Sequence, residues 1–540
     1  QVLIYPYYTT NGGNTTLLSV VNTTGEAKAV KVRFTEGLNT REVLDFNLYL
    51  SKYDVWTAAL YNADGTPTLR TGDTSCTVPY IYGNGGTQAF LPYALVDGGS
   101  VDIARTAEGH FEMIEMGTVM DDMSEIVDAS GNPTGKFEPT NGSEAAITHV
   151  DGVPGDCQQL VDAWTYSEGP EGNGDWIGDE DYGVEAPSGG LFGGAAIVNP
   201  MLGAMHTYDA TALNGWSETG YTNEGEGDSI HSEPGTTDPN LGSGDTNYGY
   251  VFGENGEPLE SGYLDTSFDA VTYVLMHDTL MNEYTTEAVV AGQTEWVVTF
   301  PTKRFYVHDI PEEVAPEGYI RPFTTAWAPI SEGVPATACE VVELNLLWDR
   351  EEQYDPEEGC EDTPEGCDKP PVVSPPRPGD DIDEPGEPFE LCYETNVIRF
   401  GDAEDDDEDD ILPDATEILG ADTYLNFDNT ALDFQYGWAR LELDDYVETT
   451  PVLDDDDNVV DYVNVPRSRY AVGNHETGDP LNGLPFVGFA VTRFSNGFIT
   501  PAGDDAQTVF SSYGGLFKHK SSRKMGSDLA PPPVVEPTAE

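Results

Sequence analysis

Three short acidic stretches, at 179–183, 405–409 and 454–458, have the spacing of ligands for a hard cation. Carboxylate and amide oxygens two residues apart allow a loop to wrap around one Ca²⁺ ion. None of the stretches is a complete EF-hand, because the bidentate Glu at the last ligand position is absent. Solvated acidic loops are the alternative. We take calcium as the candidate cofactor, with two candidate ligand groups: Asp175, Asp179 and Asp181, and Asp454, Asp456 and Asn458.

The sequence contains no recognisable catalytic motif. Its 8 His residues are scattered without a His-Glu-x-x-His pair, which disfavours a zinc protease. A Gly-x-Ser-x-Gly nucleophile elbow, a Walker loop and a dinucleotide-binding fingerprint are also missing. Carboxylates are so numerous that no pair of them singles out a glycosidase site. We therefore expect that the chain is not an enzyme.

The 6 cysteines have the pattern of disulfides rather than of a metal site, because their number is even and no Cys-x-x-Cys motif occurs. Free buried thiols are the alternative. The expected pairs are Cys360 with Cys367 across a tight Pro-Gly loop, Cys339 with Cys392 around that loop, and Cys76 with Cys157.

Three Asn residues match the acceptor triplet for N-linked glycans, in which Ser or Thr follows two positions later. Such short triplets also occur by chance. The candidate glycosylation sites are Asn14, Asn22 and Asn141.

The chain of 540 residues is strongly acidic yet has the composition of a folded protein. It holds 98 Asp and Glu against 23 Lys and Arg, a net charge of −75, but 38% of its residues are hydrophobic and 11% are aromatic. Those apolar fractions exclude a disordered chain, and the charge excludes a passive partner of nucleic acid. No apolar run reaches the roughly 20 residues of a membrane span. Because a carboxylate shell stays hydrated in concentrated salt, a saline habitat is also plausible.

The chain begins at Gln1, and the next seven residues already have a strand pattern. We expect that a signal peptide has been removed before Gln1, because the cysteines also point to an oxidising compartment. The expected location is extracellular or at the cell surface.

Strand signals and turns predict a mainly β fold with few short helices. Strand-like runs lie at 2–5, 17–21, 29–34, 44–50 and 55–61, separated by Asn-Gly, Thr-Gly and Asp-Gly turns. In the run at 29–34 the basic residues share one face and the apolar residues the other, as in a half-buried strand. Helices are expected from Asp156 onward and over 267–284, a hairpin around Asn255-Gly256, and strands over 296–300 and 341–348.

This pattern predicts two β-sandwich-like units with long acidic loops and a Pro-rich linker. Residues 1–350 form the large unit, with a loop-rich insertion at about 121–265. Residues 351–390 form the Pro- and acid-rich linker, and residues 391–515 form the smaller β unit. Residues 516–540 form a tail that is first basic and then Pro-rich.

Several phrases, about a quarter of the chain, resemble a group of secreted, uncharacterised β-rich envelope proteins of Gram-negative bacteria. They are residues 7–14, 29–34, 44–50, 296–306 (WVVTFPTKRFY) and 490–494. The resemblance implies an exported envelope protein and supplies no catalytic residue.

The function expected from these features is that of a structural subunit in an extracellular filament or surface assembly made of copies of this chain. The strand that contains Val2, Leu3, Ile4 and Tyr5 would add to a neighbour's open sheet. Four basic residues would dock on another subunit's carboxylates: Lys518, Lys520, Arg523 and Lys524.

Two alternatives remain. The first is a calcium-dependent carbohydrate-binding or adhesive surface protein, which would bind glycans through the loops between 165 and 263. The second is a secreted hydrolase whose motif is not readable.

Overall fold

The computed structural model describes most of the chain. It covers residues 1–120, 123–127, 133–139, 144–166, 173–217, 229–253, 255–307, 322–323, 338–349, 353–354, 389–401, 415–427, 435–453, 459–471, 478–499 and 509–526. The fold is mainly β, with 48% strand and 10% helix, which confirms the predicted class. None of the helices in the described part is long and apolar enough to cross a bilayer.

The N-terminal unit is built on two facing sheets. Sheet A has the order β17-β1-β9-β3-β4-β7, with β14 paired to β9. Its strands are β1 (Val2–Thr9), β3 (Ala27–Glu36), β4 (Glu42–Leu50), β7 (Cys76–Val78), β9 (Glu108–Val119), β14 (Val184–Glu185) and β17 (Thr211–Leu213). Sheet B has the order β16-β15-β2-β5-β6-β8. Its strands are β2 (Thr15–Asn22), β5 (Val55–Ala63), β6 (Thr66–Arg70), β8 (Thr87–Ala89), β15 (Leu191–Asn199) and β16 (Ala204–Asp209).

Apolar and basic residues alternate along β3, and this alternation determines which face of sheet A packs against sheet B. Val30, Val32 and Phe34 are buried in the core between the two sheets. Lys31 and Arg33 lie on the opposite face, as the alternation predicts, but the expected solvent exposure of that face is wrong. Both side chains are fully buried there, because loops cover the face and acidic side chains pair with the cations.

The C-terminal unit has two further sheets. Sheet C has the order β24-β23-β28-β21-β36, with β25 paired to β23, and sheet D has the order β27-β26-β22-β34-β35. The strands of sheet C are β21 (Thr279–Thr285), β23 (Glu340–Asp349), β24 (Gln353–Tyr354), β25 (Phe389–Leu391), β28 (Tyr436–Glu442) and β36 (Lys520–Ser522). The strands of sheet D are β22 (Gln293–Thr299), β26 (Thr395–Phe400), β27 (Leu425–Phe427), β34 (Val487–Ile499) and β35 (Val509–Lys518).

The expected unit boundaries differ from this topology in two places. The strands around 296–300 and 341–348 exist, but the first lies in sheet D and the second in sheet C, so neither completes the first sandwich. The expected linker at 351–390 falls between β23 and β25, which pair with each other through Glu340 and Leu391. The chain therefore returns to the same sheet after that segment. The basic part of the expected tail also contains strand residues, because β35 ends at Lys518 and β36 begins at Lys520.

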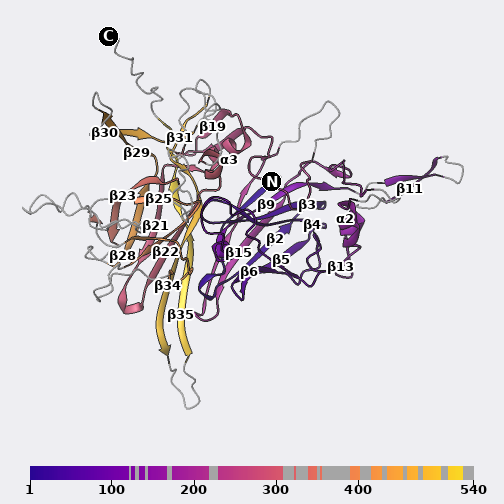
Figure 1. The fold of residues 1–540 in the computed structure, drawn as a ribbon, viewed down its shortest axis with the longest axis horizontal. Coiled ribbons are helices and arrows are strands. Elements are labelled where there is room, and N and C mark those ends of the chain that lie inside the picture. Colours follow the sequence, from indigo (N-terminus) through magenta and orange to yellow (C-terminus); the bar gives the residue numbers. More distant parts are fainter. Residues whose placement is uncertain are drawn as a thin grey trace, which may run out of the picture.

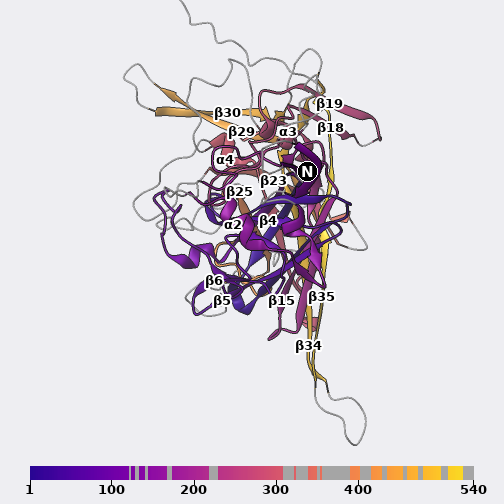
Figure 2. The same cartoon turned by 90° about the vertical axis from the view of Figure 1, so that its right-hand side faces the viewer.

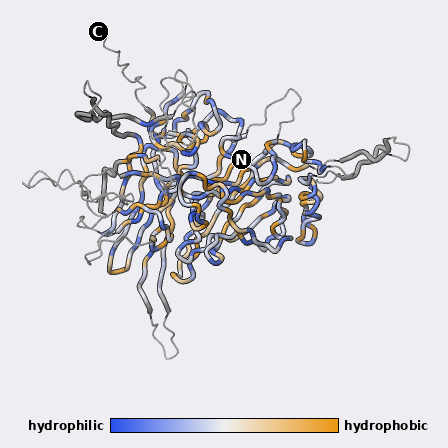
Figure 3. The backbone as a smooth tube through the Cα atoms, viewed as in Figure 1, coloured by the Kyte–Doolittle hydropathy of each residue, from blue (hydrophilic) through white to orange (hydrophobic). Residues whose placement is uncertain are grey.

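One continuous core joins the two units. Val297, Phe489 and Val491 of sheet D belong to the same buried cluster as the interior of sheets A and B. The Tyr208 ring stacks on Phe489 at 5.1 Å, and the Tyr7 ring meets Phe489 edge-on at 6.5 Å. In Figure 3 hydrophobic and hydrophilic residues alternate along the strands of both units. The two units therefore pack as one body.

The helices are short. They are α1 (Glu144–Ile147), α2 (Cys157–Ala163), α3 (Ser267–Leu275) and α4 (Lys303–Val307), with 3-10 turns η1 (Asn11–Gly13), η2 (Ile103–Ala107) and η3 (Ala288–Val290). The predicted start of α2 is confirmed, because the Asp156 carboxylate accepts a hydrogen bond from the Gln158 N–H. The predicted extent of α3 is wrong. It ends at Leu275, because Thr279 to Thr285 pair with β28 in sheet C.

Two hairpins project from the body as two-stranded arms, and the outer part of a third hairpin does the same (Figures 1 and 2). They are β10 (Met123–Val127) with β11 (Pro133–Pro139), β29 (Asp445–Leu453) with β30 (Val459–Ser468), and the outer part of β34 with β35. Beyond Arg493, β34 has left its neighbour β22 and pairs only with β35 among the described residues.

The remaining strands form small pairs. The predicted hairpin around Asn255-Gly256 is confirmed as β18 (Tyr248–Phe252) with β19 (Pro258–Tyr263). The others are β12 (His149–Val150) with β13 (Val153–Pro154), β20 (Met276–His277) with β33 (Leu484–Pro485), and β31 (Tyr470–Ala471) with β32 (Leu481–Asn482).

Candidate functional site

Two of the three expected disulfides are present. Cys76 is joined to Cys157, and Cys339 is joined to Cys392. The first ties α2 to β7, and the second ties the start of β23 to the end of β25. Cys360 and Cys367, the third expected pair, lie outside the described residues.

The expected calcium ligands do not gather in the part of the chain that is described. Asp175, Asp179 and Asp181 are all exposed, and the Asp181 carboxylate accepts a hydrogen bond from the Ser229 hydroxyl. No set of three potential metal ligands includes any of them among the described residues. Asp454, Asp456 and Asn458 lie outside those residues. The geometry therefore gives no support to a calcium site at 175–181.

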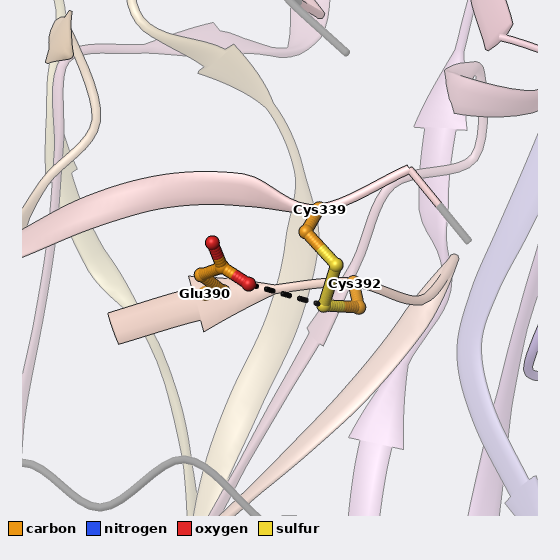
Figure 4. A group of neighbouring side chains, drawn as sticks. All are labelled: Cys339, Glu390 and Cys392. Carbon is orange, nitrogen blue, oxygen red and sulfur yellow. Dashed lines mark hydrogen bonds between the residues drawn. A yellow bond between two sulfur atoms is a disulfide. The ribbon is translucent and has the colours of Figure 1, made fainter. Parts of the chain in front are cut away.

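One set of potential ligands does come together within the described residues, formed by Cys339, Glu390 and Cys392 (Figure 4). Glu390 Oε2 lies 4.0 Å from the Cys392 sulfur. Because both sulfurs are joined in the disulfide, neither is available as a thiolate ligand. This group is a covalent link beside a carboxylate and not a metal centre.

The first two expected glycosylation sites are buried. The Asn14 side-chain amide donates to the carbonyls of Ile418 and Leu419, and the Asn22 amide donates to those of Glu26 and Ser51. Since a glycan would have to be attached to these same nitrogens, the folded chain cannot carry one at either site. That expectation is corrected for Asn14 and Asn22, whereas Asn141 lies outside the described residues.

The expected donor strand is an interior strand. Val2, Leu3, Ile4 and Tyr5 are fully buried, and β1 pairs with β9 on one side and β17 on the other. Because both backbone edges are already hydrogen-bonded, β1 cannot add to a neighbour's sheet while the fold is intact.

The expected docking cations also belong to the chain's own fold. The Arg523 guanidinium donates to the backbone carbonyls of Met276 and Val274, and Lys524 Nζ lies 3.0 Å from Asp444 Oδ2. Lys518 and Lys520 are exposed on β35 and β36. Arg523 and Lys524 therefore hold β36 and its end in place, which corrects their proposed role between subunits.

Sequence patterns did not reveal the exposed face of sheet B, which is wide and almost free of charge. Leu17 on β2 pairs with Ala196 on β15 and with Ala59 on β5, so the three side chains share this outer face. Large apolar side chains are exposed on it: Leu17 is 42% exposed, Val55 46%, Phe192 56% and Met205 59%. The rest of the face carries mostly small residues or uncharged polar ones, namely Thr15, Ser19, Val21, Thr57, Ala59, Tyr61, Gly194, Ala196, Val198 and Thr207.

Charged side chains on this face stand only near its margins. Among the residues of these strands that point to this face, two are charged: Asp209 on edge strand β16 and Arg70 at the end of β6. The central positions of this face hold no carboxylate, although the chain has a net charge of −75. We refer to this surface, from β16 across β15, β2 and β5 to β6, as the neutral face.

A second feature is an acid pair at the joint between the two units. Glu108 at the start of β9 lies beside Asp422 of the C-terminal unit, where both line one cavity, and Tyr7 donates to Glu108 Oε2 at 2.6 Å. Burial, together with the neighbouring Asp422 carboxylate, raises the pKa of Glu108 well above its ordinary value. The raised pKa favours the protonated form of Glu108.

The pair borders a cavity of about 290 Å³ that both units line. Arg105 also lines it, but its guanidinium is fully engaged by Glu36 and Asp97. That ion pairing holds the pKa of Asp97 below its ordinary value. The cation is therefore committed to the fold and is not free to bind an anionic ligand.

Comparison with protein-family models, with curated proteins and with solved structures found no match for the chain. No activity, partner or fold name is therefore transferred to it, and the function rests on the geometry described above.

Proposed function

We propose that the protein is a structural subunit of an extracellular assembly and that copies of the chain associate through the neutral face. The observation that carries this proposal is the exposure of Leu17, Val55, Phe192 and Met205 on one flat sheet of a very acidic molecule. Contiguous exposed apolar surface on a folded protein commonly marks an interaction site.

The size of the neutral face suits a homotypic contact. Five strands about 4.8 Å apart, each about seven residues long at about 3.3 Å per residue, span on the order of 600 Å² in projection. Stable interfaces bury about 800 Å² of accessible surface on each partner. Two copies of the face could stack as the sheets of a sandwich do, about 10 Å apart, in an isologous pair.

Charge favours another copy of the chain over a basic partner at this face. A cationic protein would be drawn to the carboxylate-rich remainder of the surface and not to the neutral face. Two copies that meet through the neutral face keep their carboxylates away from the contact. Their long-range repulsion remains, and salt removes it, because the Debye length falls from about 10 Å at 0.1 M to about 3 Å at 1 M.

The projecting arms add support. A two-stranded ribbon is marginally stable alone in water, yet β10 with β11 and β29 with β30 each pair only with one another among the described strands. A neighbouring subunit could pair with such an arm. An assembly that uses one face and several arms can extend beyond a dimer.

The test is a pair of charge substitutions at the centre of the face. Sedimentation velocity and negative-stain electron microscopy would compare wild type with the double variant Leu17→Glu and Phe192→Glu, at 0.1 M and at molar NaCl. Tyr263→Glu is the matched control, because Tyr263 is 66% exposed on the separate β18–β19 hairpin.

We expect wild type and Tyr263→Glu to associate in molar salt and the double variant to stay monomeric. Wild type that remains monomeric in every buffer, or a double variant that assembles normally, would overturn the proposal. Equal melting temperatures would confirm that the substitutions leave the fold intact.

A further inference from the structure

A cavity of about 340 Å³ lies where the Thr10–Thr15 loop meets the end of β5. Its walls are the backbone and side chains of that loop together with Tyr61 and Asn62. They offer amides, hydroxyls, exposed glycine backbone and one aromatic ring, and none of them is an acid or a base of the Asp, Glu, Lys, Arg or His type. In a chain with 98 acidic residues, an uncharged polar cavity is suited to a neutral ligand rich in hydroxyl groups.

The loop is held in place by residues of both units. Asn14 Nδ2 donates to the Ile418 and Leu419 carbonyls at 3.1 and 2.9 Å, and Asn199 Nδ2 donates to the Gly12 carbonyl at 3.0 Å. The backbone N–H groups of Ile418 and Leu419 are in turn bound by the buried Glu295 carboxylate. The cavity wall is therefore fixed before any ligand arrives, which lowers the entropic cost of binding.

Glycine is required at the tip of this loop. Gly12 has φ +58° and Gly13 has φ +81°, a backbone region that disfavours other residues. A Cβ at Gly12 would also lie 3.1 Å from the Gly420 Cα. The Asn-Gly-Gly-Asn sequence thus allows the loop to pack against the other unit while its opposite side faces the cavity.

From this geometry we infer that the cavity binds a neutral saccharide, with Tyr61 as the stacking ring and with Asn62 and the Gly12–Gly13 backbone as hydrogen-bonding groups. Sugars present apolar C–H faces to aromatic rings and hydroxyls that both donate and accept, which matches this lining. The volume is at the lower end of the range of about 300 to 1,000 Å³ for small-molecule pockets, so one or two sugar rings fit. The binding uses no metal ion and does not depend on subunit assembly.

Saturation-transfer difference NMR with the full-length protein tests the inference. The probes are glucose, galactose, mannose and N-acetylglucosamine, each at millimolar concentration. Thr15 and Tyr61 also lie on the neutral face, so association of subunits could cover the cavity. The probes are therefore offered both to wild type and to the monomeric Leu17→Glu, Phe192→Glu variant, in which the cavity stays open.

At least one sugar should show saturation transfer, and Tyr61→Ala should weaken its binding at least tenfold. Tyr263→Ala, with a ring on another surface, is the matched control and should bind normally. Melting temperatures would identify a variant that fails to fold, and Asn62→Ala then provides a milder test of the same wall. No saturation transfer in either background, or equal binding by the cavity variants and the control, would overturn the inference.

Discussion

The Tyr7 hydroxyl donates a 2.6 Å hydrogen bond to the Glu108 carboxyl group, which lies beside Asp422 of the other unit at the cavity that both acids line. Tyr7 is fully buried, and its ring packs edge-on against Phe489. The acid pair is therefore built on the shared core that joins the two units. Its protonation state should affect how firmly the units hold together.

The first prediction concerns the pH range between the ordinary Glu pKa of 4.5 and about 7. The folded-state pKa of Glu108 is raised, so its contribution to stability is fully present below pH 4.5 and is lost as pH rises through the folded-state pKa. Burial also raises the pKa of Glu295 to about 7, which acts in the same direction. Between about pH 4.5 and pH 7 these two carboxyl groups should make the melting temperature fall as pH rises.

The Glu108→Gln variant separates the contribution of the acid pair from the rest of the pH dependence of the melting temperature. A Gln amide can donate to Asp422 at every pH and its oxygen can still accept from Tyr7, so the melting temperature should depend less on pH. Differential scanning calorimetry measures this. Glu185→Gln, at an exposed position on β14, is the control and should keep the wild-type slope. Identical slopes in wild type and Glu108→Gln would contradict the raised pKa of Glu108.

The second prediction concerns acid. Burial lowers the pKa of His519 to about 3, and the neutral ring bridges the Val297 carbonyl and the Asn282 amide. Since its folded-state pKa is depressed, its contribution is present above the unfolded value of 6.5 and is lost as pH falls. His519→Gln cannot titrate, so it should flatten the fall in melting temperature between about pH 6.5 and pH 4. An equal fall in wild type and His519→Gln would contradict this prediction.

The strands were predictable because they depend on local patterns. The alternation in Lys31-Val32-Arg33-Phe34 correctly separated two faces, and the Asp156 cap correctly placed the start of α2. What alternation could not show is that the Lys31 face is buried, because its cover comes from residues about two hundred positions away, such as Glu233. Burial by distant loops leaves no periodic signal at the strand itself.

The candidate sites were predictable only in part for the same reason. The neutral face combines β2, β5, β15 and β16, and their outward positions become one surface only through the strand register. The Asn-x-Thr triplet at Asn14 matched a glycosylation signal, whereas its amide clamps Leu419 from 405 positions away. The exposed apolar residues on alternate positions of β2 and β15 were the available signal for the neutral face.

The third prediction concerns salt and folding. A net charge of −75 makes the carboxylates repel one another in the compact state, and ionic screening weakens that repulsion. The melting temperature should rise from 0.05 M to molar KCl, and it should do so in the monomeric Leu17→Glu, Phe192→Glu variant as well. The variant separates the effect on folding from the effect on assembly. A melting temperature that does not change with salt would show that the acidic surface does not burden the fold.

The fourth prediction concerns the disulfide between Cys339 and Cys392. It closes a segment of 53 residues between β23 and β25, two paired strands of sheet C. Closing a long segment restricts the unfolded chain, and such a link typically contributes about 2 to 4 kcal/mol to the free energy of unfolding. The double variant Cys339→Ser, Cys392→Ser should therefore unfold at lower denaturant concentration than wild type in oxidising buffer. In reducing buffer the difference between them should shrink, because wild type then loses the same link. If the two proteins unfold alike in oxidising buffer, the β23–β25 pairing holds without the covalent bond.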